Sequence, residues 1–270
     1  MELDMTICFY SGTGNSYFIA KFISEFFKNV KLVSISENFN KNITLTDDVI
    51  GIVFPVHGQG IPPVVFKFLC NTKFLEIKYS FSIASYGGVS GKALEMIDTA
   101  FQYNDIKLHY IKKIRMPANC VIAYPVLQLV LQLSTKSMEG IQKKLNRICC
   151  DIQVYKKNNF SSSLGRESFD SLLRFIQTKE IKYSERGELF YSNSKCIKCL
   201  KCVKLCPVGN VMIENQKIVF GTLCIQCMAC INWCPVKAIN WRHKTEKRNR
   251  YTNPKIEYNE MISVNKTLLE

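Results

Sequence analysis

Apolar runs and helical apolar patterns alternate along the first 115 residues of the chain. Short apolar runs that are typical of buried strands lie at residues 5–9, 31–35, 49–54, 79–84 and 107–114. Between them, apolar side chains recur at helical spacing at residues 18–27, 62–69 and 93–101. Pro62 and Pro63 suit the first turn of the second helix. This alternation predicts a parallel sheet that is covered by helices on both faces.

Three glycine-containing loops follow the predicted strands at residues 5–9, 49–54 and 79–84. Their candidate binding residues are Ser11, Gly12, Thr13, Gly14, Asn15 and Ser16 in the first loop, Pro55, Val56, His57 and Gly58 in the second, and Ser85, Tyr86, Gly87 and Gly88 in the third. Ligands of such sheets bind beyond the carboxyl ends of the strands, where the strand order reverses. The hydroxyls and glycines of the first loop, at the start of a helix, suit a phosphate, and the lack of a lysine disfavours a triphosphate. The other two loops place glycine beside a flat side chain, which suits a planar ring.

Eight of the thirteen cysteines form two copies of one spacing in the last third of the chain. They are Cys196, Cys199, Cys202 and Cys206 in the first copy and Cys224, Cys227, Cys230 and Cys234 in the second. Two such copies supply the converging thiolates that iron–sulfur cubanes need. Structural zinc is one alternative, but it takes four ligands rather than two triplets and two single cysteines. A disulfide framework is another, and it requires an oxidising compartment, whereas Met1 opens no signal-peptide pattern.

The segment from about Tyr191 to Trp241 resembles bacterial ferredoxins with two [4Fe-4S] clusters. The resemblance rests on both cysteine motifs, on Phe190 and Tyr191, and on residues 231–235. It implies that the fourth cysteine of each motif binds the cluster of the other motif. One cluster would then be bound by Cys196, Cys199, Cys202 and Cys234, and the other by Cys206, Cys224, Cys227 and Cys230. The remaining cysteines have no ligand spacing, and we expect most of them to be buried.

Residues 5–115 resemble flavodoxins in their three loops. The resemblance implies an α/β fold with a doubly wound parallel sheet in the order 2-1-3-4-5, and a bound FMN. The phosphate would be held by Ser11, Thr13, Asn15 and Ser16, and the other two loops would flank the ring. We expect backbone groups of Gly58 or Gly87 to tune the flavin. His57 is smaller than the aromatic residue that many flavodoxins carry here, and we hypothesise that it packs at the flavin edge; a surface histidine is the alternative.

The order of the parts resembles flavodoxin–ferredoxin fusion proteins of anaerobic prokaryotes. We expect a flavodoxin-like domain at residues 1–155, a connection at 156–187, a small α+β ferredoxin-like domain at 188–245 and a basic tail at 246–270. The apolar stretch at residues 120–133 is shorter than the roughly 20 residues of a membrane span, and we interpret it as core or lid. Residues 138–148 predict an amphipathic helix, and the polar residues 156–163 predict a linker.

The formal net charge of +14 counts the motif cysteines as neutral thiols and is therefore higher than the charge of the protein with its cofactors. Two clusters and FMN would lower it by about 6, to roughly +8. Basic residues gather at the first cysteine motif and after the second: Lys195, Lys198, Lys201 and Lys204, and then Arg242, His243, Lys244, Lys247, Arg248 and Arg250. A solvated charged face is the plain interpretation, and docking of an acidic redox partner is the functional one. Nucleic-acid binding is a third class, but no motif for it is recognised.

The sequence therefore predicts a cytoplasmic electron-transfer protein that passes electrons between FMN and two [4Fe-4S] clusters and on to a redox partner. The alternative is a reductase whose FMN acts directly on a quinone, a nitro compound or another flavin. Whether the protein is an electron carrier or an enzyme stays open, because no nucleophile–base constellation stands out. A composition rich in Lys, Ile and Asn, together with the lability of exposed cubanes, leads us to expect an anaerobic setting.

Overall fold

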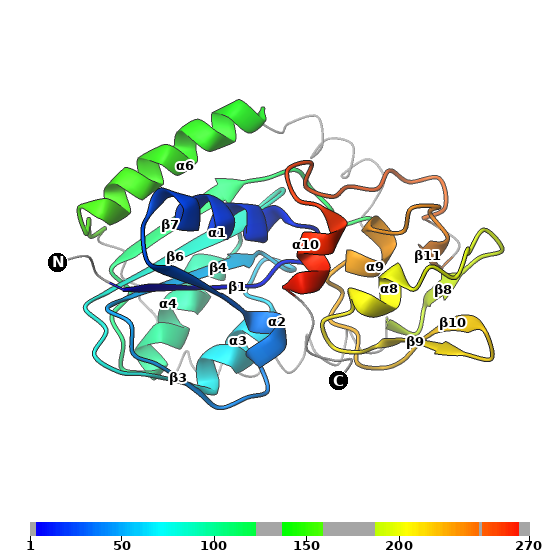
Figure 1. Ribbon diagram of the computed structural model, residues 1–270, viewed down its shortest axis with the longest axis horizontal. Helices are drawn as coiled ribbons and strands as arrows, with labels where there is room; N and C mark the ends of the chain where they lie inside the picture. The colour runs from blue at the N-terminus through cyan, green and yellow to red at the C-terminus, as the bar shows by residue number, and fades with distance from the viewer. Residues whose placement is uncertain (1–3, 123–136, 159–186, 243–244, 265–270) are drawn as a thin grey trace.

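The computed structural model describes residues 4–122, 137–158, 187–242 and 245–264 (Figure 1). Its main element is a five-stranded parallel sheet in the order β2-β1-β4-β6-β7. The strands are β1 (Met5–Phe9), β2 (Val30–Ser34), β4 (Val49–Pro55), β6 (Tyr79–Tyr86) and β7 (Tyr110–Arg115). Counted among themselves, these strands have the order 2-1-3-4-5. The expected flavodoxin-like, doubly wound α/β fold is therefore confirmed.

Helices cover both faces of this sheet (Figure 1). One face carries α1 (Asn15–Phe26) and α6 (Met138–Gln153), and the other carries α2 (Ile35–Asn38), α3 (Pro63–Cys70) and α4 (Ala93–Tyr103). A hydrophobic core lies on each face of the sheet, because successive side chains of a strand point to opposite faces. Ile7 and Phe9 face the layer of α1 and α6, whereas Cys8 and Tyr10 face the layer of α2, α3 and α4. The amphipathic helix that residues 138–148 predict is present as α6, and Ile141 and Leu145 bury its apolar face.

A smaller α+β part follows in the chain and lies against the carboxyl ends of the strands (Figure 1). Its elements are β8 (Phe190–Ser192), α8 (Lys201–Lys204), β9 (Val211–Glu214), β10 (Lys217–Phe220), α9 (Ala229–Asn232) and β11 (Ile239–Trp241). β9 and β10 form one antiparallel pair, and β8 and β11 form another. The expected ferredoxin-like arrangement is present, with its own core around Phe190, Ile231 and Ile239.

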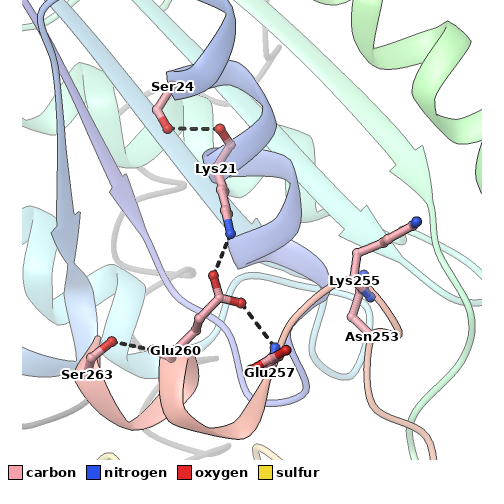
Figure 2. A network of polar contacts seen from close by, with 7 residues as sticks. All are labelled: Lys21, Ser24, Asn253, Lys255, Glu257, Glu260 and Ser263. Carbon is pink, nitrogen blue, oxygen red and sulfur yellow. Dashed lines mark hydrogen bonds and ion pairs between the residues drawn. The ribbon is translucent and has the colours of Figure 1, made fainter.

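The C-terminal segment, residues 245–264, runs back to the flavodoxin-like part and was expected as a basic tail. It ends in α10 (Tyr258–Ser263), which lies beside the start of α1 in Figure 1. Figure 2 shows Glu260 of α10 in an ion pair with Lys21 of α1. Ile256 and Met261 are buried in the same core as Ile19. This segment therefore joins the two parts of the chain.

Several smaller features were not evident from the sequence pattern. A parallel pair of three-residue strands, β3 (Ile43–Leu45) and β5 (Thr72–Phe74), lies apart from the main sheet. Most of the apolar stretch at 120–133 and of the predicted linker at 156–163 lies outside the described residues. Among the helices that the structure describes, none has the length and apolar character needed to cross a membrane.

Candidate functional site

The eight motif cysteines line two separate cavities in the ferredoxin-like part. Cys196, Cys199, Cys202 and Cys234 line one cavity, which we call the outer cage, together with Leu200, Ile218 and Ile239. Cys206, Cys224, Cys227 and Cys230 line the other, which we call the inner cage, together with Phe190, Val208 and Phe220. Each cavity thus combines three cysteines of one motif with the last cysteine of the other. In the part of the chain that the structure describes, no group of three or more His, Cys, Asp or Glu side chains is arranged for a single metal ion.

The two motifs shape their backbones in the same way. Lys198 and Leu200 in the first motif have φ angles of 52° and 58°, and the equivalent Gln226 and Met228 in the second have φ angles of 52° and 63°. Non-glycine residues rarely adopt this left-handed conformation, so its repetition marks a shared structural requirement. A shared loop geometry of this kind points three sulfurs of each motif into one cavity.

Backbone N–H groups approach several of the cage sulfurs. The amide of Asn210 donates to Cys206 Sγ at 3.1 Å, and the amide of Ala238 donates to Cys234 Sγ at 3.2 Å. Asn210 and Ala238 are equivalent positions, because each lies four residues after the last cysteine of its motif. Their amides hold the cysteine that each motif contributes to the cage of the other motif. Hydrogen bonds to sulfur are one of the means by which a protein sets the potential of a cluster.

Burial raises the pKa of several cage thiols. The pKa of Cys202 and of Cys227 is raised to about 12, and that of Cys224 to about 11, chiefly because burial disfavours the charged thiolate. Burial also raises the pKa of Cys230, and the neighbouring cysteines add to the effect. Without metal the thiols are therefore protonated at neutral pH, and cluster binding must release protons.

The inner cage lies directly against the first loop of the flavodoxin-like part. A Cβ atom added to Gly12 would stand 2.2 Å from the carbonyl oxygen of Cys227, so only glycine permits this approach. Trp233 Nε1 donates to the Gly12 carbonyl at 3.1 Å, and Cys227 packs against both cores of the main sheet. The inner cage is therefore the one that faces the carboxyl end of β1.

Cys227, which makes this contact, does not line the outer cage, whose own motif is rich in lysines. Cys199 is exposed, as are Lys195, Lys198, Lys204 and Lys237. The second motif lacks this charge, because Gln226, Ala229 and Asn232 stand where the first motif has Lys198, Lys201 and Lys204. Ala229 and Asn232 are buried, and Asn232 Nδ2 donates to the Asn119 carbonyl at 3.0 Å. The neutral motif is thus the one that contacts Gly12 and Asn119.

The first loop is buried, and its side chains are already held. Thr13 accepts from Asn119 Nδ2, and Asn15 Oδ1 accepts from Tyr251 Oη at 2.9 Å and from Asn253 Nδ2 at 3.1 Å. Ser16 and Ser85 share a hydrogen bond of 2.9 Å, which connects the first loop with the third. Sequence reasoning assigned no role to Asn119, Tyr251 or Asn253, because none of them belongs to a recognisable motif.

The backbone of this loop has amide groups without acceptors. Gly14, with a φ angle of 93°, is the N-cap of the twelve-residue helix α1, and its amide donates to Ser11 Oγ. The amides of Gly12, Thr13, Asn15 and Ser16 donate to no acceptor among the described residues. Unpaired amides at a helix N-terminus are the groups that hold an anion, so the loop retains donors for a phosphate although its side chains are engaged.

The second and third loops meet beside the first, at the same edge of the sheet. The Val56 amide donates to the Ser85 carbonyl at 2.8 Å. His57 is half-buried and packs edge-to-face on Tyr10, with ring centroids 5.9 Å apart. Pro55, Val56, Tyr86, Gly87 and Gly88 are also partly exposed, and Gly58 is exposed. The structure thus brings all three loops together, and the two expected to flank a ring are more open than the first.

One expected flavin-tuning group is already engaged. The Gly87 carbonyl accepts from Arg115 Nε at 3.1 Å, and a Cβ atom at Gly87 would stand 2.9 Å from Ala118. The residues that follow β7 therefore cover the third loop closely, which leaves the Gly87 carbonyl less available to a ligand.

The expectation for the other five cysteines was wrong for three of them. Cys8 and Cys149 are buried, whereas Cys70, Cys120 and Cys150 are exposed. The exposed thiols lie at a helix end, in a loop and on the outer face of α6, where small apolar residues need no burial.

Two of the basic residues after the second motif are engaged in hydrogen bonds. Arg248 donates to the Val121 carbonyl, and Arg250 donates to the Ile239 carbonyl and Asn240 Oδ1.

Comparison with protein families finds one match. Residues 195–239 match the model described as 4Fe-4S dicluster domain. The chain joins a flavodoxin-like fold to a 4Fe-4S dicluster region. No curated protein matches the chain. An electron-transfer or oxidoreductase role is consistent with both parts.

Solved structures with some similarity include three proteins of low sequence identity. Smu.1420 from Streptococcus mutans has 10% identity and a TM-score of 0.39, with 57% of this chain and 99% of that chain covered. An FMN-dependent NADH-azoreductase from Bacillus anthracis has 11% identity and a TM-score of 0.33, with 54% and 100% covered. Rubredoxin oxygen:oxidoreductase from Desulfovibrio gigas has 16% identity and a TM-score of 0.34, with 53% and 36% covered. The fold assignment rests on the strand order of this chain.

Proposed function

We propose that this protein is an iron–sulfur flavoprotein that passes electrons between FMN and two [4Fe-4S] clusters and on to a redox partner. The observation that carries the proposal is the pairing of cysteines in the two cavities, each lined by three cysteines of one motif and the last of the other. This is the exchange that two-cluster ferredoxins use. Cubanes bound in this way take up and release single electrons.

The two cages lie at different places in the molecule, and this supports an order of the redox centres across it. The inner cage lies at the carboxyl end of β1, against Gly12, and the outer cage presents Cys199 to solvent. The outer cage is then the side for a redox partner, and the inner cage is the side for the flavin. A short separation between neighbouring centres is what electron transfer requires, and the close contact between Gly12 and Cys227 supports it.

The flavin proposal rests on the three loops at one edge of the sheet. The amides of Gly12, Thr13, Asn15 and Ser16 would hold the phosphate, with Ser11 close by. Residues 55–58 and 85–88 would flank the ring. The side chains of Asn119, Tyr251 and Asn253 would not bind the phosphate directly but would fix the loop that does.

The partner is proposed to be an acidic redox protein. Lys195, Lys198, Lys204 and Lys237 are exposed beside the cysteines of the outer cage. Charge complementarity chiefly raises the rate of encounter, which suits a transient electron-transfer complex. Lys195, Lys198 and Lys204 have no basic counterpart in the second motif, where Leu223, Gln226 and Asn232 stand, and this supports a role of these lysines at the surface rather than in cluster binding.

A reductase is the second candidate. The partial exposure of residues 55–57 and 86–88 favours it, because a flavin held between these loops would be accessible to a small molecule. Turnover of a quinone or nitro compound at the same rate with and without an acceptor protein would favour the reductase. Turnover that needs a protein acceptor would favour the carrier.

The test is anaerobic reconstitution with iron, sulfide and FMN, followed by measurement of iron, labile sulfide and flavin per chain. About eight iron and one FMN are expected. Cys199→Ala and Cys224→Ala should each lose about half of the iron, because each removes a ligand from a different cage. Cys150→Ala, which changes an exposed cysteine outside both cages, is the matched control and should retain it. Equal iron in all four proteins would contradict the proposed ligand sets.

A further inference from the structure

Tyr10 is the residue that follows β1, and its hydroxyl is buried without a partner. The side chain has a relative exposure of 0% and packs in the core beneath the sheet. Within the described part of the chain, its hydroxyl oxygen makes no hydrogen bond of good geometry, although it lies near enough to the Cys227 thiol for hydrogen bonding to affect the pKa of both groups. The other two fully buried tyrosine hydroxyls of the sheet are satisfied, since Tyr79 donates to the Lys156 carbonyl and Tyr110 donates to Asp151. An unpaired buried hydroxyl is unfavourable and therefore requires an explanation.

The surroundings of Tyr10 belong to the inner cage. Val208, Ile225 and Cys227 of the ferredoxin-like part pack against the same core as Tyr10. Two residues further along the chain, Gly12 lies in contact with the Cys227 carbonyl. Burial raises the pKa of Tyr10 well above its ordinary value, and Cys227, Cys206 and Cys224 are the neighbouring groups that raise it further. A phenol hydroxyl carries its proton at neutral pH and can donate it in a hydrogen bond toward these sulfurs.

The orientation of the Tyr10 ring is also fixed. On one side, the ring of His57 packs edge-to-face on it, with the centroids 5.9 Å apart. On the other, Tyr10 continues β1, whose neighbours β2 and β4 hold the backbone, and its own amide donates to the Val53 carbonyl at 3.0 Å. The hydroxyl is thus held against the inner cage by the flavodoxin-like part and not by the ferredoxin-like part.

We propose that Tyr10 donates its hydroxyl hydrogen bond to a sulfur of the cluster in the inner cage, and that this bond raises the reduction potential of that cluster. The proposal rests on the proposed function, because it needs a cluster between Cys206, Cys224, Cys227 and Cys230. A donor near sulfur stabilises the reduced state, which carries one more negative charge, more than the oxidised state. Tyr10 is a positioning and tuning residue, and through it the flavodoxin-like part sets the potential of a centre that the ferredoxin-like part binds.

The test is Tyr10→Phe in the reconstituted holoprotein, which removes only the hydroxyl. Potentiometric titration followed by EPR should show one cluster with a more negative midpoint potential, and the second cluster unchanged. Tyr79→Phe is the matched control, because it removes another buried tyrosine hydroxyl far from both cages, and it should shift neither cluster. Unchanged potentials in Tyr10→Phe, or an equal shift of both clusters, would overturn the proposal.

A double variant identifies which of the two cages holds the cluster whose potential shifts. In Cys199→Ala, which disables the outer cage, the shift caused by Tyr10→Phe should persist in the remaining cluster. Para-aminophenylalanine at position 10 restores a donor and should restore the potential. If Tyr10→Phe takes up no iron, Tyr10→Leu, which also lacks the donor, replaces it with the same expected direction. A wild-type protein without iron would contradict the proposed function, whereas full iron with unshifted potentials would contradict only the role of Tyr10.

Discussion

The indole Nε1 of Trp233 donates a 3.1 Å hydrogen bond to the carbonyl oxygen of Gly12. Trp233 precedes the last cysteine of the second motif, and Gly12 lies in the loop that follows β1. One hydrogen bond thus connects a residue beside both cages to the candidate phosphate loop. The second motif carries Asn232 and Trp233 where the first carries Lys204 and Leu205, and both Asn232 and Trp233 make side-chain hydrogen bonds to the flavodoxin-like part.

Gly12 lies so close to the Cys227 carbonyl that it does not tolerate a side chain. In Gly12→Ala the new methyl group would stand 2.2 Å from the Cys227 carbonyl, so the loop and the inner cage must move apart. We expect a loss of about 1–3 kcal/mol in the free energy of unfolding. Anaerobic chemical denaturation of the holoprotein measures it. Gly221→Ala is the control, because its nearest neighbour would be 3.4 Å away, and equal stability of the two variants would contradict the contact.

The lysines at the outer cage predict a charge-dependent reaction rate. Lys198→Glu reverses an exposed charge beside Cys199 and should slow electron transfer to a purified acidic ferredoxin by a factor of about 3–10 at low ionic strength. The difference should shrink as salt is added, because salt screens exposed charges. Lys73→Glu makes the same change in net charge on β5, away from both cages. If both variants slow the reaction equally, net charge rather than a docking face controls the rate. Stopped-flow absorbance gives the rates.

Local patterns predicted the strands and the two cysteine motifs, whereas the strand order and the division of the cysteines into two ligand sets followed from the resemblances to flavodoxins and ferredoxins. Alternating apolar runs define β1, β4 and β6 within a residue or two, and the Cys-x-x-Cys spacing fixes which thiols can converge. The position of the inner cage against the sheet could be recognised only from the fold. The second motif has Gln226 and Asn232 where the first has Lys198 and Lys204, and this difference was a sequence signal for it. A buried side of a repeat loses its charges, and comparison of the two motifs would have indicated it.

The C-terminal segment could not be recognised in the same way. Its helix α10 has six residues, which is too short for a helical period to be read, and Ile256 and Met261 are isolated apolar positions among charges. Tyr251 and Asn253 have no motif, and they reach Asn15 only because the chain returns across the sheet edge. Long-range contacts of this kind depend on the whole fold rather than on neighbouring residues.

The ion pair between Glu260 and Lys21 predicts a small stabilisation with a defined pH range. Lys21 lowers the pKa of Glu260 from its ordinary 4.5, so the contribution of this carboxylate is complete above about pH 4.5 and is lost as the pH falls through the lowered pKa. The pKa of Lys21 is raised, so its contribution is lost only at alkaline pH. Because both side chains are about one third exposed, Glu260→Gln should cost about 0.2–1 kcal/mol.

This cost should be the same at pH 7 and at pH 5, since the carboxylate stays ionised in the folded protein over that range. Thermal unfolding followed by circular dichroism at the two pH values measures it. Glu139→Gln breaks the exposed pair with Lys143 on α6 and serves as the control with little effect. A cost for Glu260→Gln that disappears already at pH 5 would mean that Lys21 does not lower the pKa.

The candidate phosphate loop predicts a specific loss of flavin affinity. Asn15→Asp keeps the oxygen that accepts from Tyr251 and Asn253, but it removes the Nδ2 donor to the Pro117 carbonyl and adds a negative charge beside the unpaired amides. That charge competes with a phosphate for the same helix N-terminus. We expect the Kd for FMN, measured by quenching of flavin fluorescence, to rise about tenfold or more. Asn42→Asp, an exposed position before β3, carries the same change in charge and should bind FMN like the wild type. Because riboflavin lacks the phosphate, its affinity should change far less in Asn15→Asp. An equal loss for FMN and riboflavin would place the effect of Asn15 outside phosphate binding.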